Sequence, residues 1–123
     1  MLKNILFVML GGAVGSTLRY LVQVGCHHLH WTTLPLGTFM VNIVGCFILG
    51  LVLGISERYA HFSEATFMML SVGLCGAFTT FSTFSADTIR MMGNGQWWIA
   101  LGYLTASIVT GFMLFYLGRK MIL

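Results

Sequence analysis

Four apolar stretches, each close to the length that crosses a lipid bilayer, make up most of this chain. They cover residues 4–24, 36–55, 66–89 and 97–118. About 20 helical residues span the ~30 Å of bilayer hydrocarbon, and lipid leaves helices and closed barrels as the structures that satisfy their own backbone groups. The sequence therefore predicts an all-α integral membrane protein, with residues 1–123 forming a single four-helix membrane domain.

The composition agrees with this class. Hydrophobic residues are 58% of the 123 positions and charged residues 7%, whereas about 25% of a soluble domain is charged. A soluble fold of this size could not bury that much apolar surface. The net charge of +3 includes no basic cluster, so the expected partner is the lipid bilayer and not nucleic acid.

With four spans, both chain ends lie on one side of the membrane. That side carries Lys3, Arg58, Arg119 and Lys120, and the other carries Arg90. This bias favours cytoplasmic termini, but so few charges leave insertion in both orientations open.

Glycine pairs at helical spacing predict close packing between the helices. Gly11 and Gly15 form one small-xxx-small pair, and Gly50 and Gly54 form another. Four short helices enclose little volume, so a pore would need an oligomer.

The third stretch contains an unusually polar segment, GAFTTFSTFS at residues 76–85. Lipid cannot satisfy these hydroxyls, so the segment should face protein, water or an ion. Gly73, Gly76, Thr79 and Thr80 weaken the helix in the middle of the stretch. A break there would free carbonyl oxygens that suit a small hard cation, whereas the alternative is an unbroken helix with glycines at a packing contact.

Two phenylalanines of this segment share one side of a helix. Phe81 and Phe84 are three residues apart, and their positive ring edges could stabilise an anion. Ordinary aromatic packing explains the same spacing. The hydroxyls of Ser82, Thr83 and Ser85 could also bond to carbonyls one turn back.

Other polar side chains also lie in or near the apolar stretches. Asn42 needs partners, either from another helix or from a passing ion, and Thr38 extends the polar stripe on the same face. Arg19 either reaches the membrane surface or lines an anion vestibule. Asp87, beside Arg90, is interpreted as a residue at the mouth of the third span. No nucleophile is paired with an orienting base, so an enzyme is not expected.

Three segments together carry a family resemblance: GGAVGSTLRY at residues 11–20, GTFMVNIVGCF at 37–47 and GLCGAFTTFSTF at 73–84. At these residues the chain resembles the Fluc/CrcB family of small fluoride channels, in order and over essentially its whole length. The resemblance implies an antiparallel dual-topology homodimer with two pores, in a prokaryotic plasma (inner) membrane. It implies passive export of cytoplasmic fluoride down its gradient.

The resemblance also assigns roles to individual residues. The implied ion-pathway residues are Asn42, Phe81, Phe84, Ser82, Thr83, Thr38, Tyr103, Ser107 and Arg19. Backbone carbonyls of Gly76 and Thr79 match positions that hold a structural sodium ion at the dimer centre. Gly111 stands where some relatives carry a hydroxyl, which leaves the lining from the fourth span open.

Two other functions compete with a fluoride channel. One is a proton-coupled small-cation exporter of similar size, but such proteins use a glutamate in the first helix, and the first stretch here has Arg19 and no acid. The other is a non-transporting membrane assembly subunit, in which the polar residues would only join helices.

Overall fold

The computed structural model describes residues 1–28 and 33–123, and these residues are helical apart from short connections. The elements are α1 (Leu2–His27), α2 (Leu36–Arg58), α3 (Glu64–Met68), η1 (Met69–Cys75), α4 (Gly76–Phe78), α5 (Phe81–Gly93) and α6 (Trp97–Ile122). The element η1 is a π-helix. Together α3, η1, α4 and α5 form one membrane span, the third crossing.

The prediction of four membrane-spanning helices is confirmed. The candidate spans are Leu2–His27, Leu36–Arg58, Glu64–Gly93 and Trp97–Ile122. Each helix runs further than the corresponding apolar stretch at one or both ends. Glu57 and Arg58, for example, lie in the last turn of α2, beyond the apolar stretch that ends at residue 55. Hydropathy marks the edge of the hydrocarbon, whereas a helix continues into the polar interface.

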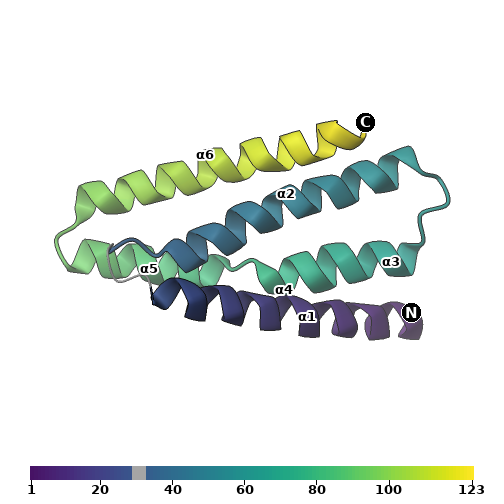
Figure 1. Ribbon diagram of the computed structural model, residues 1–123, viewed down its shortest axis with the longest axis horizontal. Helices are drawn as coiled ribbons and strands as arrows, with labels where there is room; N and C mark the ends of the chain where they lie inside the picture. Colours follow the sequence, from purple (N-terminus) through teal and green to yellow (C-terminus); the bar gives the residue numbers. More distant parts are fainter. Residues whose placement is uncertain (29–32) are drawn as a thin grey trace.

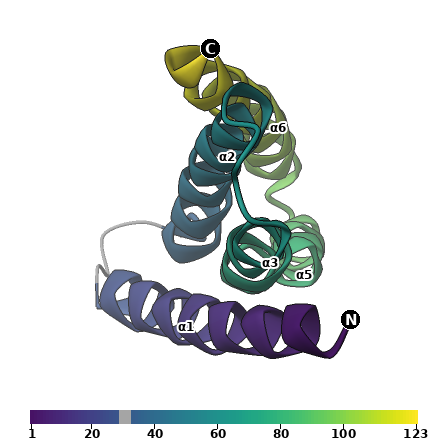
Figure 2. The ribbon, with the colours of Figure 1, turned by 90° about the vertical axis from the view of Figure 1, so that its right-hand side faces the viewer.

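The four crossings form two pairs. Helix α2 packs along α6, and α1 packs against the third crossing, mainly η1 and α4. Figure 1 shows these neighbours side by side with both chain ends at the same end of the molecule, and Figure 2 shows α1 beside α3 and α5 on one side and α2 beside α6 on the other.

Close backbone contact at glycines explains the pairing, as the small-xxx-small spacing predicted. A Cβ atom on Gly11 or Gly15 would lie 2.1 Å or 2.3 Å from a carbonyl oxygen of η1. A Cβ atom on Gly50 or Gly54 would lie 2.2 Å or 2.8 Å from a carbonyl oxygen of α6. Only glycine permits such an approach, so these positions set which helices are neighbours.

The break predicted in the third span is confirmed, and the alternative of an unbroken helix is wrong. Thr79 (φ −81°, ψ 159°) and Thr80 (φ −150°, ψ 114°) are extended and separate α4 from α5. We call these two residues the break. The π-helical turns of η1 just before it were not predicted. Both irregularities occur in the same crossing, where neighbouring helices can compensate for lost backbone hydrogen bonds.

Large apolar side chains face outward along α1 and α6. Leu10 on α1 is 62% exposed and Phe112 on α6 is 75% exposed. Exposing this apolar surface to water would be unfavourable. We expect lipid or a second copy of the chain to cover it. A small buried core, formed by Phe84, Met91, Ala100 and Tyr103, joins α5 to α6.

Candidate functional site

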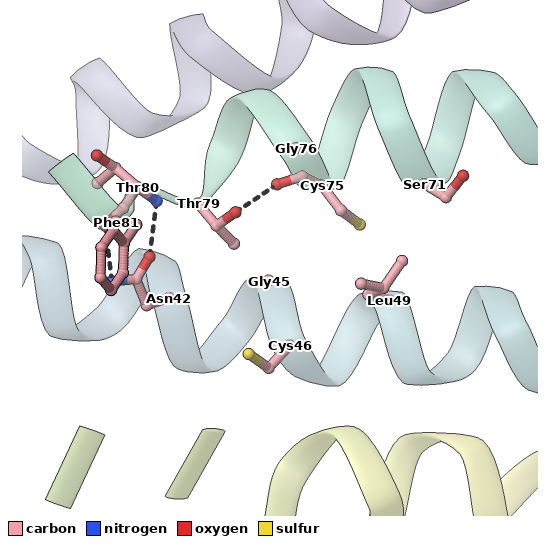
Figure 3. A pocket seen from close by; sticks show the side chains of 10 residues that line it. All are labelled: Asn42, Gly45, Cys46, Leu49, Ser71, Cys75, Gly76, Thr79, Thr80 and Phe81. Atoms are coloured by element: carbon pink, nitrogen blue, oxygen red, sulfur yellow. Dashed lines mark hydrogen bonds between the residues drawn. The ribbon is translucent and has the colours of Figure 1, made fainter. Parts of the chain in front are cut away.

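The amide of Asn42 is bonded to the peptide of Thr80 at the break. The Thr80 N–H donates to Asn42 Oδ1 at 2.7 Å, and Asn42 Nδ2 donates to the Thr80 carbonyl oxygen at 3.1 Å (Figure 3). In a continuous helix the Thr80 N–H would bond to the carbonyl of Gly76. A side chain of α2 therefore replaces the partner that the third crossing lost.

Helix α5 begins directly after the break with a side-chain cap. The hydroxyl oxygen of Thr80 accepts a hydrogen bond from the Thr83 N–H at 3.2 Å. That N–H is one of the first four of α5, which have no partner within the helix, so the cap satisfies it. Because Thr79 and Thr80 are extended, the carbonyl oxygens of Gly76 and Thr79 both lack the N–H donor that a continuous helix would give them.

Arg19 of α1 reaches the break. Its Nη1 donates to the Thr79 carbonyl oxygen at 3.5 Å, a long hydrogen bond. The guanidinium thus brings a positive charge to the point where a carbonyl dipole is exposed. Spacing along the sequence could not reveal this contact, because the two residues are 60 positions apart.

The carbonyl oxygens of Gly76 and Thr79 are ligands of the type that a small hard cation binds. Such cations bind several oxygen ligands. One chain supplies two here, of which the Thr79 oxygen also accepts the long hydrogen bond from Arg19, so the fit needs further oxygens from elsewhere. A Cβ on Gly76 would meet nothing nearer than the Ser71 carbonyl oxygen at 3.8 Å, so the Gly76 side of the helix is open to approach. Within residues 1–28 and 33–123, no group of three or more His, Cys, Asp or Glu side chains is arranged to hold a metal.

Three aromatic rings follow one another from α5 to α6. The ring centroids of Phe81 and Phe84 are 6.0 Å apart, and those of Phe84 and Tyr103 are 5.3 Å apart. Phe81 is 79% exposed, whereas Phe84 and Tyr103 are 8% and 6% exposed. The row therefore leads from the open surface of α5 into the α5–α6 contact.

The hydroxyls of α5 behave in two ways. Ser85 donates to the Phe81 carbonyl one turn back at 3.0 Å, as the packing alternative proposed. Ser82 and Thr83 instead gather around Thr80, whose hydroxyl lies 3.3 Å from Ser82 Oγ and donates to Thr83 Oγ1 at 3.1 Å. The Thr83 hydroxyl oxygen accepts in this contact, so the Thr83 hydroxyl proton remains available for another hydrogen bond.

Two hydroxyls of α6 are buried without a partner. Neither Tyr103 Oη nor Ser107 Oγ makes a hydrogen bond of normal geometry within the described part of the chain, although Thr38 lies close to the Tyr103 hydroxyl. The two residues are four apart and share one face of the helix. Since buried polar groups are normally paired, these two are the strongest local sign of a route for a polar species.

Asp87 holds a position that the sequence did not reveal. Thr38 Oγ1 donates to Asp87 Oδ2 at 2.7 Å, and the Asp87 residue is 8% exposed. Arg90 Nη1 lies 3.5 Å from the other carboxylate oxygen. The proposed mouth residue is therefore a buried acceptor that binds a predicted pathway hydroxyl. The i, i+3 spacing of Asp87 and Arg90 was the available signal.

Several of the predicted pathway residues line cavities of the single chain, and these residues are divided among different cavities. A cavity of about 270 Å³ at the break contains Asn42, Gly76, Thr79 and Phe81 (Figure 3). A polar cavity of about 450 Å³, here called the vestibule, is lined by Gln23, Cys26, His27, Leu34, Pro35, Leu36, Gly37, Thr38, Thr83, Asp87 and Arg90. Tyr103 and Ser107 line separate apolar grooves along α6.

Comparison with known proteins gives a consistent result. The family described as "CrcB-like protein, Camphor Resistance (CrcB)" matches residues 6–119. A protein of Leptospira interrogans named fluoride-specific ion channel FluC is 40% identical over 120 residues, covering 98% of this chain and 94% of its own length. Proteins with the same name from Phocaeicola vulgatus and Chloroflexus aurantiacus are each 38% identical over 117 residues. Each match covers 95% of this chain, with 96% and 93% of the relatives' own lengths.

Proposed function

The chain belongs to the CrcB/FluC family of fluoride channels, and we propose on that basis that it exports cytoplasmic fluoride passively, down its electrochemical gradient. Membership of this family makes it a channel and not an enzyme. It is a multi-pass membrane protein with four candidate spans, and the relatives named above are bacterial. We place it in the plasma (inner) membrane.

Within the structure, the observation that best supports this proposal is the pair of buried hydroxyls Tyr103 Oη and Ser107 Oγ. Fluoride is small and strongly hydrated, so a route through the membrane must replace its water with hydrogen-bond donors. Hydroxyls that no protein group occupies can donate to the ion. The neighbouring rings of Phe81 and Phe84 would add positive edges without a formal charge that traps it.

We assign the remaining roles along the same route. Asn42 Nδ2 carries two N–H groups, and its bond to the Thr80 carbonyl uses one of them. The second would donate to fluoride. Ser82 and Thr83 would continue the line of hydroxyls, and Arg19 would attract the anion toward the break.

A second copy of the chain completes the proposed channel as an antiparallel, dual-topology homodimer with two pores. Three features favour such a partner: the exposed ring of Phe81, the open side of Gly76, and the division of the pathway residues among separate hollows. Carbonyls of Gly76 and Thr79 from both subunits would together offer four oxygens to a structural sodium ion. That ion would supply positive charge at the subunit contact.

Flux measurements on purified protein in liposomes test the function. Fluoride should pass under an imposed gradient and chloride should hardly pass, and equal flux of both ions would count against the proposal. A proton-coupled cation exporter would instead move cations with a pH dependence, although α1 contains no Asp or Glu to carry the proton. An assembly subunit would pass neither anion.

A further inference from the structure

The vestibule contains an ion pair, although the chain has few charges. The whole chain has six Lys and Arg residues and three Asp and Glu residues. Asp87 and Arg90 face this one cavity, together with Thr38 and Thr83. The pair also lines a second cavity of about 310 Å³ with Asn94 and Gln96, so it stands between two hollows at the same end of the molecule.

The two partners differ in how they are held. The Asp87 side chain is 11% exposed and is fixed by the 2.7 Å hydrogen bond from Thr38. The Arg90 side chain is 72% exposed and contacts the carboxylate at 3.5 Å. The negative charge is therefore fixed inside the vestibule, and the positive charge lies at its rim with room to move.

A fixed carboxylate is unfavourable for a fluoride route. Thr38 gives its proton to Asp87, so the Thr38 hydroxyl is not free to donate to an anion at this level. Repulsion between like charges is strong where water is partly excluded. Arg19, which could offset it, contacts Thr79 at the break and does not line the vestibule. Among the described residues that line this cavity, Arg90 is the one Lys or Arg side chain.

We propose that Arg90 is the counter-charge that offsets Asp87 and so keeps the vestibule open to fluoride. The inference rests on the proposed function and adds a residue to it. Arg90 acts here as a positioning residue, because its effect passes through the field of the Asp87 carboxylate.

Replacing Arg90 tests this role. Loss of one nearby, partly solvated charge should lower fluoride flux by about threefold to tenfold in Arg90→Gln. The loss should shrink at high salt, because the screening length falls from ~30 Å at about 0.01 M to ~3 Å at about 1 M ionic strength. Arg90→Lys keeps the charge and should retain most of the flux. Lys3→Gln, the same charge change at the other end of the molecule, should have no comparable effect.

A double variant distinguishes a counter-charge from an independent contribution. Asp87→Asn removes the charge but keeps an oxygen that can accept from Thr38. On this background, Arg90→Gln should cost little, and Asp87→Asn alone should raise flux at low salt. The inference is overturned if Arg90→Gln has normal flux at low salt, or if it costs as much with Asn at position 87 as with Asp.

Two further results remain decisive. Should Arg90→Gln fail to yield folded protein by size-exclusion chromatography, Asp87→Asn alone decides, and unchanged low-salt flux in that variant refutes the counter-charge. Wild-type vesicles that pass no fluoride would instead reject the proposed function, and this inference with it.

Discussion

Replacing Asn42 with leucine measures its structural and conductive roles separately. The side chain makes two hydrogen bonds to the Thr80 peptide, at 2.7 Å and 3.1 Å. Leucine has a similar volume and can make neither. Hydrogen bonds between membrane helices average about 0.6 kcal/mol and reach about 1.7 kcal/mol, so the free energy of unfolding should fall by about 1–3 kcal/mol.

Fluoride flux should fall much further than this loss of stability explains. A hydrogen bond to a charged group contributes about 1.5–3 kcal/mol, and each ~1.4 kcal/mol on a barrier is a factor of about ten in rate. If the second Asn42 N–H donates to the ion, flux per folded protein should drop by about tenfold to a hundredfold. A fluoride electrode on reconstituted liposomes measures this, after folded protein is quantified by size-exclusion chromatography.

A matched control separates the two effects. Thr105 of α6 donates to the Leu101 carbonyl of its own helix at 2.9 Å, so Thr105→Val removes a polar group without touching the break. Flux and unfolding free energy should both stay close to wild type. If Asn42→Leu keeps normal flux per folded protein, Asn42 is not in the pathway. If its unfolding free energy is unchanged, the Thr80 bonds do not hold the break.

Three further outcomes are expected. Tyr103→Phe removes a buried hydroxyl without a partner, so flux should fall while thermal stability in detergent stays equal or rises; full flux would remove this hydroxyl from the route. In Gly45→Val, the added Cβ would lie 2.2 Å from Thr79 Cγ2, so unfolding free energy should fall by about 1–3 kcal/mol and flux with it. Gly12→Ala, where no atom lies within 4 Å of the added Cβ, is its control, and an equal loss there would contradict the steric argument. Replacing sodium with a bulky organic cation during purification should lower fluoride flux, and indifference would argue against a sodium ion at the Gly76 and Thr79 carbonyls.

Much of the fold could be predicted because its signals are local. The length and hydropathy of four stretches predicted four spanning helices, and the glycine pairs marked the close contacts of α1 and α2. The weakened segment around Gly76 and Thr80 predicted the break. The boundaries were less accurate, because hydropathy does not report where a helix ends.

The arrangement of the candidate site residues could not be predicted from the sequence. The sequence pointed to Asn42 as a side chain in need of a partner, and the structure supplies Thr80, 38 positions away. It placed Asp87 near a mouth, but the bond from Thr38 crosses 49 positions. The π-helical turns at 69–75, which pack against α1, carried no recognised signal in the sequence.

The sequence by itself therefore determined that the helices lie in lipid, how many times the chain crosses the membrane, and where the third crossing is weak. These follow from transfer free energies and backbone preferences that neighbouring residues fix. Only the tertiary structure decided which side chain replaces the lost helical partner at the break, which hydroxyls remain without one, and which charge lies inside the vestibule. Those outcomes depend on contacts between segments that are far apart in the sequence, because other helices supply the partners for the groups that a broken helix leaves unbonded.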